Sequence, residues 1–354
     1  ADPLKHVEDT VMIAGQSYPN QIGGEFSPGK GFDVVKTKYA SLNISLYGMA
    51  RYINQTAEKD SFTDHLGRER FTDLRNDIHW HRTFIWFTGF FYTPRLRYNV
   101  SVWGLTTTDQ VLLFGNLQYF AHRALRLGVG IGPNLGSRSM QGSWPFWNAG
   151  DRQMADDFFR PGFTNGFWIA GEPIKRVNYQ FMIGNALSNL GVKAGDLTRD
   201  FSYSASLNWM PTTGEFGPRG GTSDFEMHEK VATRIGASFT TMKDDRLNSI
   251  AAGSSPINTQ VRLSDAVLLY ETGSLADGVT IQKSTYQLLS IDYGIKYKGF
   301  SLNGEFYFRN LSDFKADGEL PVDEINDTGF FASASYMVIK KRLDNWADDK
   351  SVSL

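Results

Sequence analysis

Apolar and polar residues alternate one by one along many segments of this chain, each of roughly ten residues. In segment 201–209, for example, Tyr203 and Leu207 belong to an apolar set that serines and an asparagine interrupt at every second position. A period of two places the two kinds of side chain on opposite faces of a β-strand. The same pattern recurs in segments 42–52, 96–103, 125–132, 176–183, 231–240, 290–297, 300–309 and 330–338. We therefore expect an all-β fold over a single domain, 1–354.

The composition excludes several classes of protein. The 354 residues include no Cys, which rules out a disulfide framework, a thiolate metal site and a cysteine nucleophile. The formal net charge of -2 lacks the basic excess of a nucleic-acid-binding protein, so nucleic acid is not an expected partner. No run of about 18 apolar residues predicts a transmembrane helix. A hydrophobic content of 41% is too high for a disordered chain.

The links between strands are of two kinds. Links 92–95 and 298–299 are very short, whereas the links at about 55–76, 243–283 and 311–326 are long and polar. Short turns at one end and long loops at the other are typical of an antiparallel transmembrane β-barrel, which satisfies every backbone group within the hydrocarbon layer. Aromatic residues near strand ends match the interfacial girdles of such barrels; they are Tyr52, Tyr92, Trp209, Tyr297, Phe300 and Tyr336. A soluble β-sandwich also produces the alternation, so a soluble all-β glycan-binding protein is the alternative.

If the apolar face of each strand meets lipid, the residues of opposite parity face the lumen. Basic residues dominate that set, and basic rings in a narrow lumen favour anions. The basic candidates are Arg51, Arg97, Arg126, Arg176, Arg234, Lys296 and Arg309, and the acidic candidates are Asp292 and Glu305. We expect the two carboxylates to pair with Lys296 or Arg309. Loop carboxylates that neutralise the arginines would instead give a mixed pore, and both possibilities stay open.

The segment at about 134–163 lacks the alternation and is rich in aromatic and charged residues, including the run Trp144, Pro145, Phe146 and Trp147. Such a long aromatic loop is costly to leave in water. We therefore expect it to fold into the barrel as a constriction loop. The constriction residues would be Arg138, Arg152 and Arg160 facing Asp151, Asp156 and Asp157. The alternative is an external loop packed on a neighbouring subunit or on another loop.

A sequence of short motifs surrounds this loop. The Gly-rich strand 125–132 precedes it, the motifs at 158–161 and 164–168 follow, and the strand 179–185 comes next. In this order the chain resembles the phosphate-selective porin O/P family of Gram-negative outer membranes. The resemblance implies a homotrimeric barrel of sixteen strands whose third loop folds inward, surrounded by membrane lipid and lipopolysaccharide. It also implies a channel for passive diffusion of small anionic or polar solutes.

The chain departs from that family in two respects. Its arginines are scattered where the phosphate-selective members carry a dense arginine ladder and a lysine cluster, so phosphate selectivity and general diffusion both stay open. Only about thirteen strands can be recognised, whereas bacterial barrels have an even number. A further turn and strand should begin at 340–343, so the C-terminal strands are expected to be missing or unidentified.

Other candidate sites are weak. His79 and His81 share one face of a strand, but no third metal ligand is visible, so no metal is expected. The glycines of 128–136 do not form a dinucleotide-binding motif, and small residues are expected where the loop leaves the wall. No His lies in a catalytic-triad context, so neither an enzyme nor a cofactor is expected; a barrel enzyme is the least favoured alternative.

Overall fold

The computed structural model of this chain describes residues 10–13, 16–19, 31–55, 59–72, 74–105, 110–141, 146–148, 151–188, 200–217, 220–245 and 261–337. Strands account for 62% and helices for 4%, which confirms the predicted all-β fold class. The segment 340–343, where the sequence predicts a further strand, lies outside these residues, as do Trp144 and Pro145.

Most of the strands belong to one large sheet. Its members are β3 (Phe32–Lys36), β4 (Ala40–Gln55), β7 (Arg75–Phe91), β8 (Thr93–Leu105), β9 (Gln110–His122), β10 (Leu125–Pro133), β11 (Phe163–Ile174), β12 (Val177–Gly184), β13 (Ser202–Trp209), β14 (Ala232–Asp245), β15 (Ile281–Tyr297), β16 (Phe300–Ala316) and β17 (Ile325–Tyr336). Two separate hairpins are β1 (Thr10–Ile13) with β2 (Gln16–Pro19), and β5 (Ser61–Thr63) with β6 (Glu69–Phe71). The helical elements are η1 (Arg138–Gln141) and α1 (Met154–Phe159). No helix in the described part of the chain has the length and apolarity needed to span a membrane.

The sheet is an antiparallel meander. Its 13 strands follow the order β17-β16-β15-β14-β13-β12-β11-β10-β9-β8-β7-β4-β3, so each strand lies beside its predecessor except where the β5–β6 hairpin intervenes. Its edges within the described residues are β17 and β3. Closure of the sheet into a barrel, and a total of sixteen strands, therefore remain predictions.

The two faces of the sheet differ in the way the alternation predicts. Tyr179, Leu207, Ala237, Ile291, Phe306 and Phe330 are cross-strand partners in one row over six strands. In this row Leu207 is 54% exposed and Phe330 is 67% exposed. The adjacent row turns to the other face and includes Ser206, Ser238 and Ser290, which are all buried. The sheet thus exposes an apolar outer face and buries a polar inner face.

The short turns are confirmed. β4 ends at Gln55 and β7 begins at Arg75, close to the bounds predicted for the first long link. Tyr92 alone separates β7 from β8, and Lys298 and Gly299 join β15 to β16. Both residues of the second turn have positive φ, 48° and 86°, which suits a tight turn between twisted strands. The link predicted at 311–326 contracts to 317–324, because polar residues such as Ser312 and Lys315 continue the ladder opposite Thr285 and Lys283.

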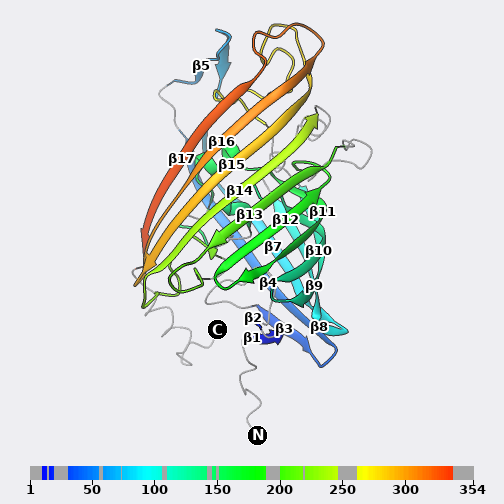
Figure 1. Cartoon of the computed structure of the whole chain (residues 1–354). Coiled ribbons are helices and arrows are strands. Elements are labelled where there is room, and N and C mark those ends of the chain that lie inside the picture. The colour runs from blue at the N-terminus through cyan, green and yellow to red at the C-terminus, as the bar shows by residue number, and fades with distance from the viewer. Residues whose placement is uncertain are drawn as a thin grey trace.

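The sheet curves around residues 134–141, 146–148 and 151–162, which we call the inner segment. Asn148 Nδ2 donates to Ser333 Oγ on β17 at 2.9 Å. Asp151 accepts a hydrogen bond from Arg51 on β4 at 3.3 Å. Because β17 and β4 stand near opposite ends of the strand order, both ends of the sheet must approach the same segment. Figure 1 shows the tilted strands passing on both sides of this interior.

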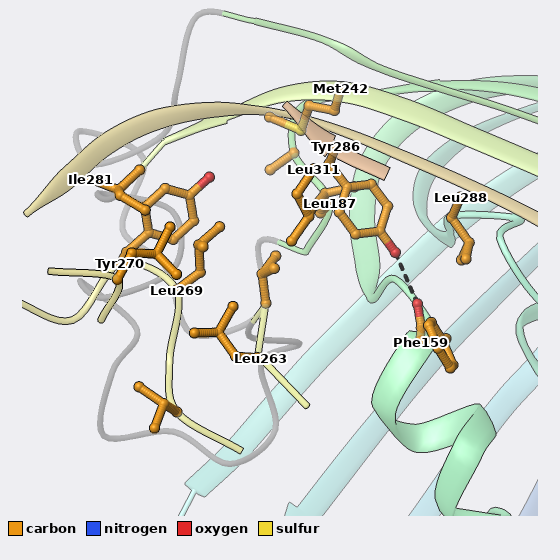
Figure 2. Close-up of a cluster of buried hydrophobic side chains, with 14 of the residues drawn as sticks. Phe159, Leu187, Met242, Leu263, Leu269, Tyr270, Ile281, Tyr286, Leu288 and Leu311 are labelled. Atoms are coloured by element: carbon orange, nitrogen blue, oxygen red, sulfur yellow. Dashed lines mark hydrogen bonds between the residues drawn. The ribbon is translucent and has the colours of Figure 1, made fainter. Parts of the chain in front are cut away.

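An apolar cluster anchors the inner segment to the inner face of β14–β16 (Figure 2). Phe159 of α1 stacks on Tyr307, with ring centroids 5.1 Å apart, and its carbonyl accepts a hydrogen bond from Tyr286 at 2.9 Å. Segment 261–280 completes the cluster with Leu269 and Tyr270, which are both fully buried. The interior beside these strands is therefore filled by side chains.

The glycines of β10 make room for one large ring. A Cβ atom added at Gly128 would lie 2.0 Å from the Trp168 ring, and one at Gly132 would lie 3.3 Å from it. Trp168 is buried on the neighbouring strand β11, against Leu135 and Met182. The Gly-rich strand therefore accommodates an aromatic side chain where the inner segment leaves the sheet.

Candidate functional site

Arg138 is the central residue of the inner segment. Its guanidinium donates to Asn303 Oδ1 at 2.9 Å and to the carbonyls of Gly220 and Gly221 at 3.1 and 3.2 Å. Its backbone N–H donates to Glu305 Oε1 at 2.9 Å. Arg138 is only 3% exposed. It therefore connects the inner segment, the wall of the sheet and a second stretch of chain.

That second stretch consists of residues 210–217 and 220–231, in the link between β13 and β14 at the end of the sheet where the other turns are short. We call it the turn segment. Lys296 Nζ donates to the Phe216 carbonyl at 2.7 Å, and Asn303 Nδ2 donates to the Thr222 carbonyl at 2.9 Å. The Thr222 N–H in turn donates to the carbonyl of Phe146, in the inner segment, at 2.7 Å. Two segments from opposite ends of the sheet therefore meet against its inner face.

The sequence analysis missed this second inner element. The sequence does carry a signal for this element. The link between the alternating segments 201–209 and 231–240 is long, whereas the neighbouring links at the same end of the sheet are short. Asp224 fastens the segment near its end by accepting hydrogen bonds from the Gly299 N–H at 2.7 Å and from His228. Asp224 is 1% exposed, so this anchor lies inside the fold.

Most of the candidate arginines pair with carboxylates. Arg234 Nε lies 2.8 Å from Asp292 Oδ1. The other ion pairs among the candidates and their neighbours are Arg51–Asp151 at 3.3 Å, Arg152–Asp156 at 3.5 Å, Arg160–Asp157 at 2.9 Å and Arg309–Asp327 at 2.6 Å. Asp151 also accepts from Arg82, at 2.9 Å. Much of the basic excess read from the sequence is therefore neutralised locally.

The pairing predicted for Asp292 and Glu305 is wrong. Asp292 binds Arg234, and Glu305 accepts from the Arg138 N–H and from Tyr307 Oη at 2.8 Å. Lys296 instead donates to the Phe216 carbonyl, and its ammonium lies 4.4 Å from the centroid of that ring. Asp292 takes its partner from the neighbouring strand β14, whereas the inner segment supplies a partner of Glu305 and the turn segment supplies that of Lys296.

Three further candidates, Arg97, Arg126 and Arg176, contact a backbone carbonyl or an aromatic ring. Arg97 Nε donates to the Pro94 carbonyl at 3.1 Å. Arg97 and Arg126 both lie against Phe120, with their guanidinium carbons 5.0 and 5.5 Å from the ring centroid. Arg176 has a φ of 73° and lies in the turn between β11 and β12, where it donates to the Pro211 carbonyl at 2.6 Å.

A cavity of about 440 Å³ lies between the two inner elements and the wall formed by β10–β14. The basic residues that line it are Arg123, Arg126, Arg138 and Arg234, and the acidic residues are Glu172 and Glu215. Polar side chains without charge complete much of the wall; they are Asn178, Gln180, Ser206, Asn208 and Gln141. The sequence analysis named three of these arginines but not Arg123, which lies in a turn outside the alternation.

Glu215 contributes a negative charge at the edge of this cavity. Burial acts to raise its pKa, but hydrogen bonds from the Gly217 N–H, at 2.7 Å, and from His228 outweigh that effect and lower the pKa below its usual value. A carboxyl with a lowered pKa stays ionised at neutral pH. Glu215 therefore counts as a full negative charge beside the four arginines.

A second, much smaller cavity of about 30 Å³ adjoins the predicted constriction residues Arg138, Asp151, Arg152 and Asp156. A cavity of that volume has room for no more than a few water molecules. Asp156 is buried and accepts hydrogen bonds from Ser137 and Ser139 at 2.8 and 2.9 Å. These residues mainly hold the inner segment together, and the larger cavity is the better candidate for a solute.

The histidine pair has local partners. The rings of His79 and His81 lie 5.5 Å apart, and His79 Nδ1 lies 2.6 Å from Asp77. Within the residues that the structure describes, no group of three or more potential ligands could hold a metal ion.

Comparison with protein-family models and with curated proteins gives no match for this chain. The fold and the cavity by themselves define an all-β protein with one large curved antiparallel sheet, an apolar outer face and an arginine-lined interior.

Proposed function

We propose that this chain is a porin of a Gram-negative outer membrane, which lets small hydrophilic solutes diffuse passively and has a modest preference for anions. The observation that carries the proposal is the distribution of side chains between the two faces. Leu207, Ile291 and Phe306 are 54%, 44% and 45% exposed, whereas Ser238 and Ser290 on the opposite face are 2% and 1% exposed. Contiguous exposed apolar surface on this scale marks an interaction site, and lipid covers such a band around the whole of a barrel.

A sheet in lipid cannot leave its edges open, because each unpaired backbone group in hydrocarbon costs several kcal/mol. The proposed barrel therefore closes by pairing of the edges of β3 and β17 through additional strands. The porin O/P resemblance supports sixteen strands, a homotrimer, and contacts with membrane lipid and lipopolysaccharide. The curvature that brings Ser333 and Arg51 to the same inner segment is consistent with such closure.

The proposed anion preference is modest because the basic excess is small. The 440 Å³ cavity has four arginines against two glutamates, and further arginines of the interior are paired. Low-dielectric walls focus the field of the remaining positive charge and raise the local concentration of anions. This arrangement supports general diffusion with a bias towards anions more than strict phosphate selectivity.

The test is reconstitution of the detergent-purified chain into planar lipid bilayers under a KCl gradient. We expect discrete conductance steps and a reversal potential of the sign given by chloride permeation. The double change Arg126→Ala with Arg234→Ala should shift the reversal potential towards zero, whereas Lys298→Ala, in an exposed turn, should leave it unchanged. A chain that stays soluble without detergent and forms no channels would instead support the glycan-binding alternative, and a cation-selective channel would refute the anion preference.

A further inference from the structure

We infer that the 440 Å³ cavity is a binding site for a hydroxylated organic anion of monosaccharide size, such as a sugar acid; this deepens the porin function proposed above and rests on it. The cavity falls in the lower half of the range of about 300–1,000 Å³ that small-molecule sites occupy. It is larger than an inorganic ion needs and too small for a long oligosaccharide. Three features of its lining define the class of solute.

The first feature is the charge balance. Four guanidinium groups line the cavity, and two of them are already bound to carboxylates: Arg123 to Glu172, and Arg234 to Asp292 at 2.8 Å. Glu215 adds a third negative charge. Two more charged groups bond to lining residues, Lys296 to the Phe216 carbonyl and Glu305 to the Arg138 N–H, while arginines outnumber carboxylates in the lining itself by four to two. An anionic group of a solute is therefore favoured beside these guanidinium groups.

The second feature is a patch of amides and a hydroxyl on β12 and β13. Asn178 is the cross-strand partner of Asn208, and Gln180 is the partner of Ser206, so the four side chains lie side by side on the inner face. None of these four side chains makes a hydrogen bond to another residue in the part of the chain that the structure describes. Each amide offers both donors and an acceptor. The hydroxyl groups of a solute can pair with both the donors and the acceptor of an amide, because each hydroxyl donates and accepts.

The third feature is the position of this patch relative to the arginines. Arg126 on β10 lies on one side of β12 and β13, and Arg234 on β14 lies on the other. Arg234 is held in place by Asp292 and by Gln141 Oε1, which accepts from its Nη2 at 2.7 Å. A solute in the cavity therefore meets a charged group at either end and neutral hydrogen-bonding groups between them. A solute with one carboxylate and several hydroxyls can place the carboxylate at one of these guanidinium groups and its hydroxyls against the neutral groups.

Single-channel recordings with gluconate as the probe test this inference. We expect gluconate to block the chloride current at a concentration at least about tenfold lower than acetate, glucose or inorganic phosphate requires. Acetate lacks the hydroxyls, glucose lacks the charge, and phosphate presents mainly acceptors to the amide oxygens. The double change Asn178→Ala with Asn208→Ala should raise the half-blocking concentration of gluconate about tenfold, because each amide contributes a modest hydrogen bond. Ser290→Ala changes the same inner face outside the cavity and should have no effect.

Calorimetric titration of the detergent-solubilised chain with gluconate gives a second readout that does not depend on conduction. If channels form but gluconate is no more potent than acetate or glucose, the binding inference is wrong and the porin function stands. A half-blocking concentration that is lower for phosphate than for gluconate also overturns the binding inference, because the site would then bind anions by their charge without recognising hydroxyl groups. If no channels form, the porin function fails, and the solute-binding role in a channel fails with it.

Discussion

The Arg82 guanidinium donates to Asp151 Oδ2 over 2.9 Å and thereby ties the inner segment to β7. Arg51 on β4 reaches the same carboxylate oxygen at 3.3 Å. Burial acts to raise the pKa of Asp151, but the charge of Arg82 and hydrogen bonds from Arg82 and the Arg152 N–H outweigh it and lower the pKa. A single ionised carboxylate therefore pairs with two arginines at this point and neutralises one of their two positive charges.

Replacement of this carboxylate should change ion selectivity. In Asp151→Asn, Arg51 and Arg82 lose their shared counter-charge, so the interior gains one positive charge. We expect the reversal potential in a KCl gradient to shift further towards the chloride value. Asp157→Asn is the matched control, because Asp157 is in the same segment but its side chain is 62% exposed. Equal shifts in the two variants would contradict a specific role for the Asp151 pair.

Loss of Arg138 should both destabilise the fold and widen the passage. Arg138→Ala leaves the Asn303 amide oxygen and the carbonyls of Gly220 and Gly221 without their donor. Buried acceptors without partners cost about 1–3 kcal/mol each, so we expect a loss of roughly 3 kcal/mol in unfolding free energy. Conductance should rise, because the inner and turn segments lose the contacts that Arg138 makes between them. Guanidinium unfolding and single-channel conductance are the measurements.

Two variants make the Arg138 experiment specific. Arg138→Lys keeps the charge but lacks the forked donor geometry, so it should fall between the native chain and the alanine variant. Arg95→Ala removes an exposed arginine at the start of β8 and should change neither quantity. An alanine variant with native stability and conductance would show that the two segments do not depend on Arg138.

A charge on the outer face separates a membrane sheet from a soluble one. We expect Ile291→Arg to weaken folding into lipid vesicles by about 2–4 kcal/mol, as an arginine at the bilayer midplane does. In a soluble protein, the same change at a residue that is 44% exposed should stay within about 0.5 kcal/mol. Val322→Arg, in the link between β16 and β17, is the control and should be neutral in both cases. Equal folding free energies for the two variants would argue against the lipid-facing role.

A clasp of charged residues joins the β5–β6 hairpin to segment 261–280. His65 Nδ1 lies 2.7 Å from Asp265, and Arg70 lies 3.6 Å from Glu271. Asp64 holds the hairpin itself by accepting hydrogen bonds from several neighbours, including Arg68 at 2.9 Å. Figure 1 shows β5 at the end of the sheet that also carries the links β14–β15 and β16–β17. The clasp therefore joins two links across that end.

This clasp should open in acid. Burial acts to raise the pKa of Asp265, but hydrogen bonds from His65 and from the Val267 N–H outweigh it and lower the pKa. A lowered carboxyl pKa contributes stability that is present above the ordinary value of about 3.9 and is lost as the pH falls through the lowered value. Spin labels at Phe71→Cys and Ala276→Cys, in a chain without native Cys, should report one short distance at pH 6 and longer distances below about pH 3.9.

Asp265→Asn is the variant that isolates the carboxylate in this experiment. The amide cannot ionise, so the labelled pair should show a broader distance distribution that no longer changes between neutral and acidic pH. A native pH response in this variant would assign the opening to other groups of the clasp, such as Asp64 or Glu271.

The alternation of side chains alone determined the strand content and the two faces of the sheet. Leu207 and Ser206 face opposite sides because successive residues of any strand do, so the pattern is readable without a partner strand. The turn at Lys298 and Gly299 could also be predicted from the sequence, because the geometry of a two-residue turn depends on adjacent residues. The inward position of Phe159 agrees with the expectation that an aromatic segment avoids water.

Only the tertiary structure decided which groups the charged residues of the interior bind. Asp292 binds Arg234 from the neighbouring strand, and the turn segment supplies the carbonyl that Lys296 binds. Neither choice is visible in the sequence, because a charge pairs with whichever group lies within a few ångströms, and the separation along the chain does not set that distance. The cavity has the same origin, since Arg126, Arg138 and Asn208 meet only when the sheet curves and the two inner elements fold back against it.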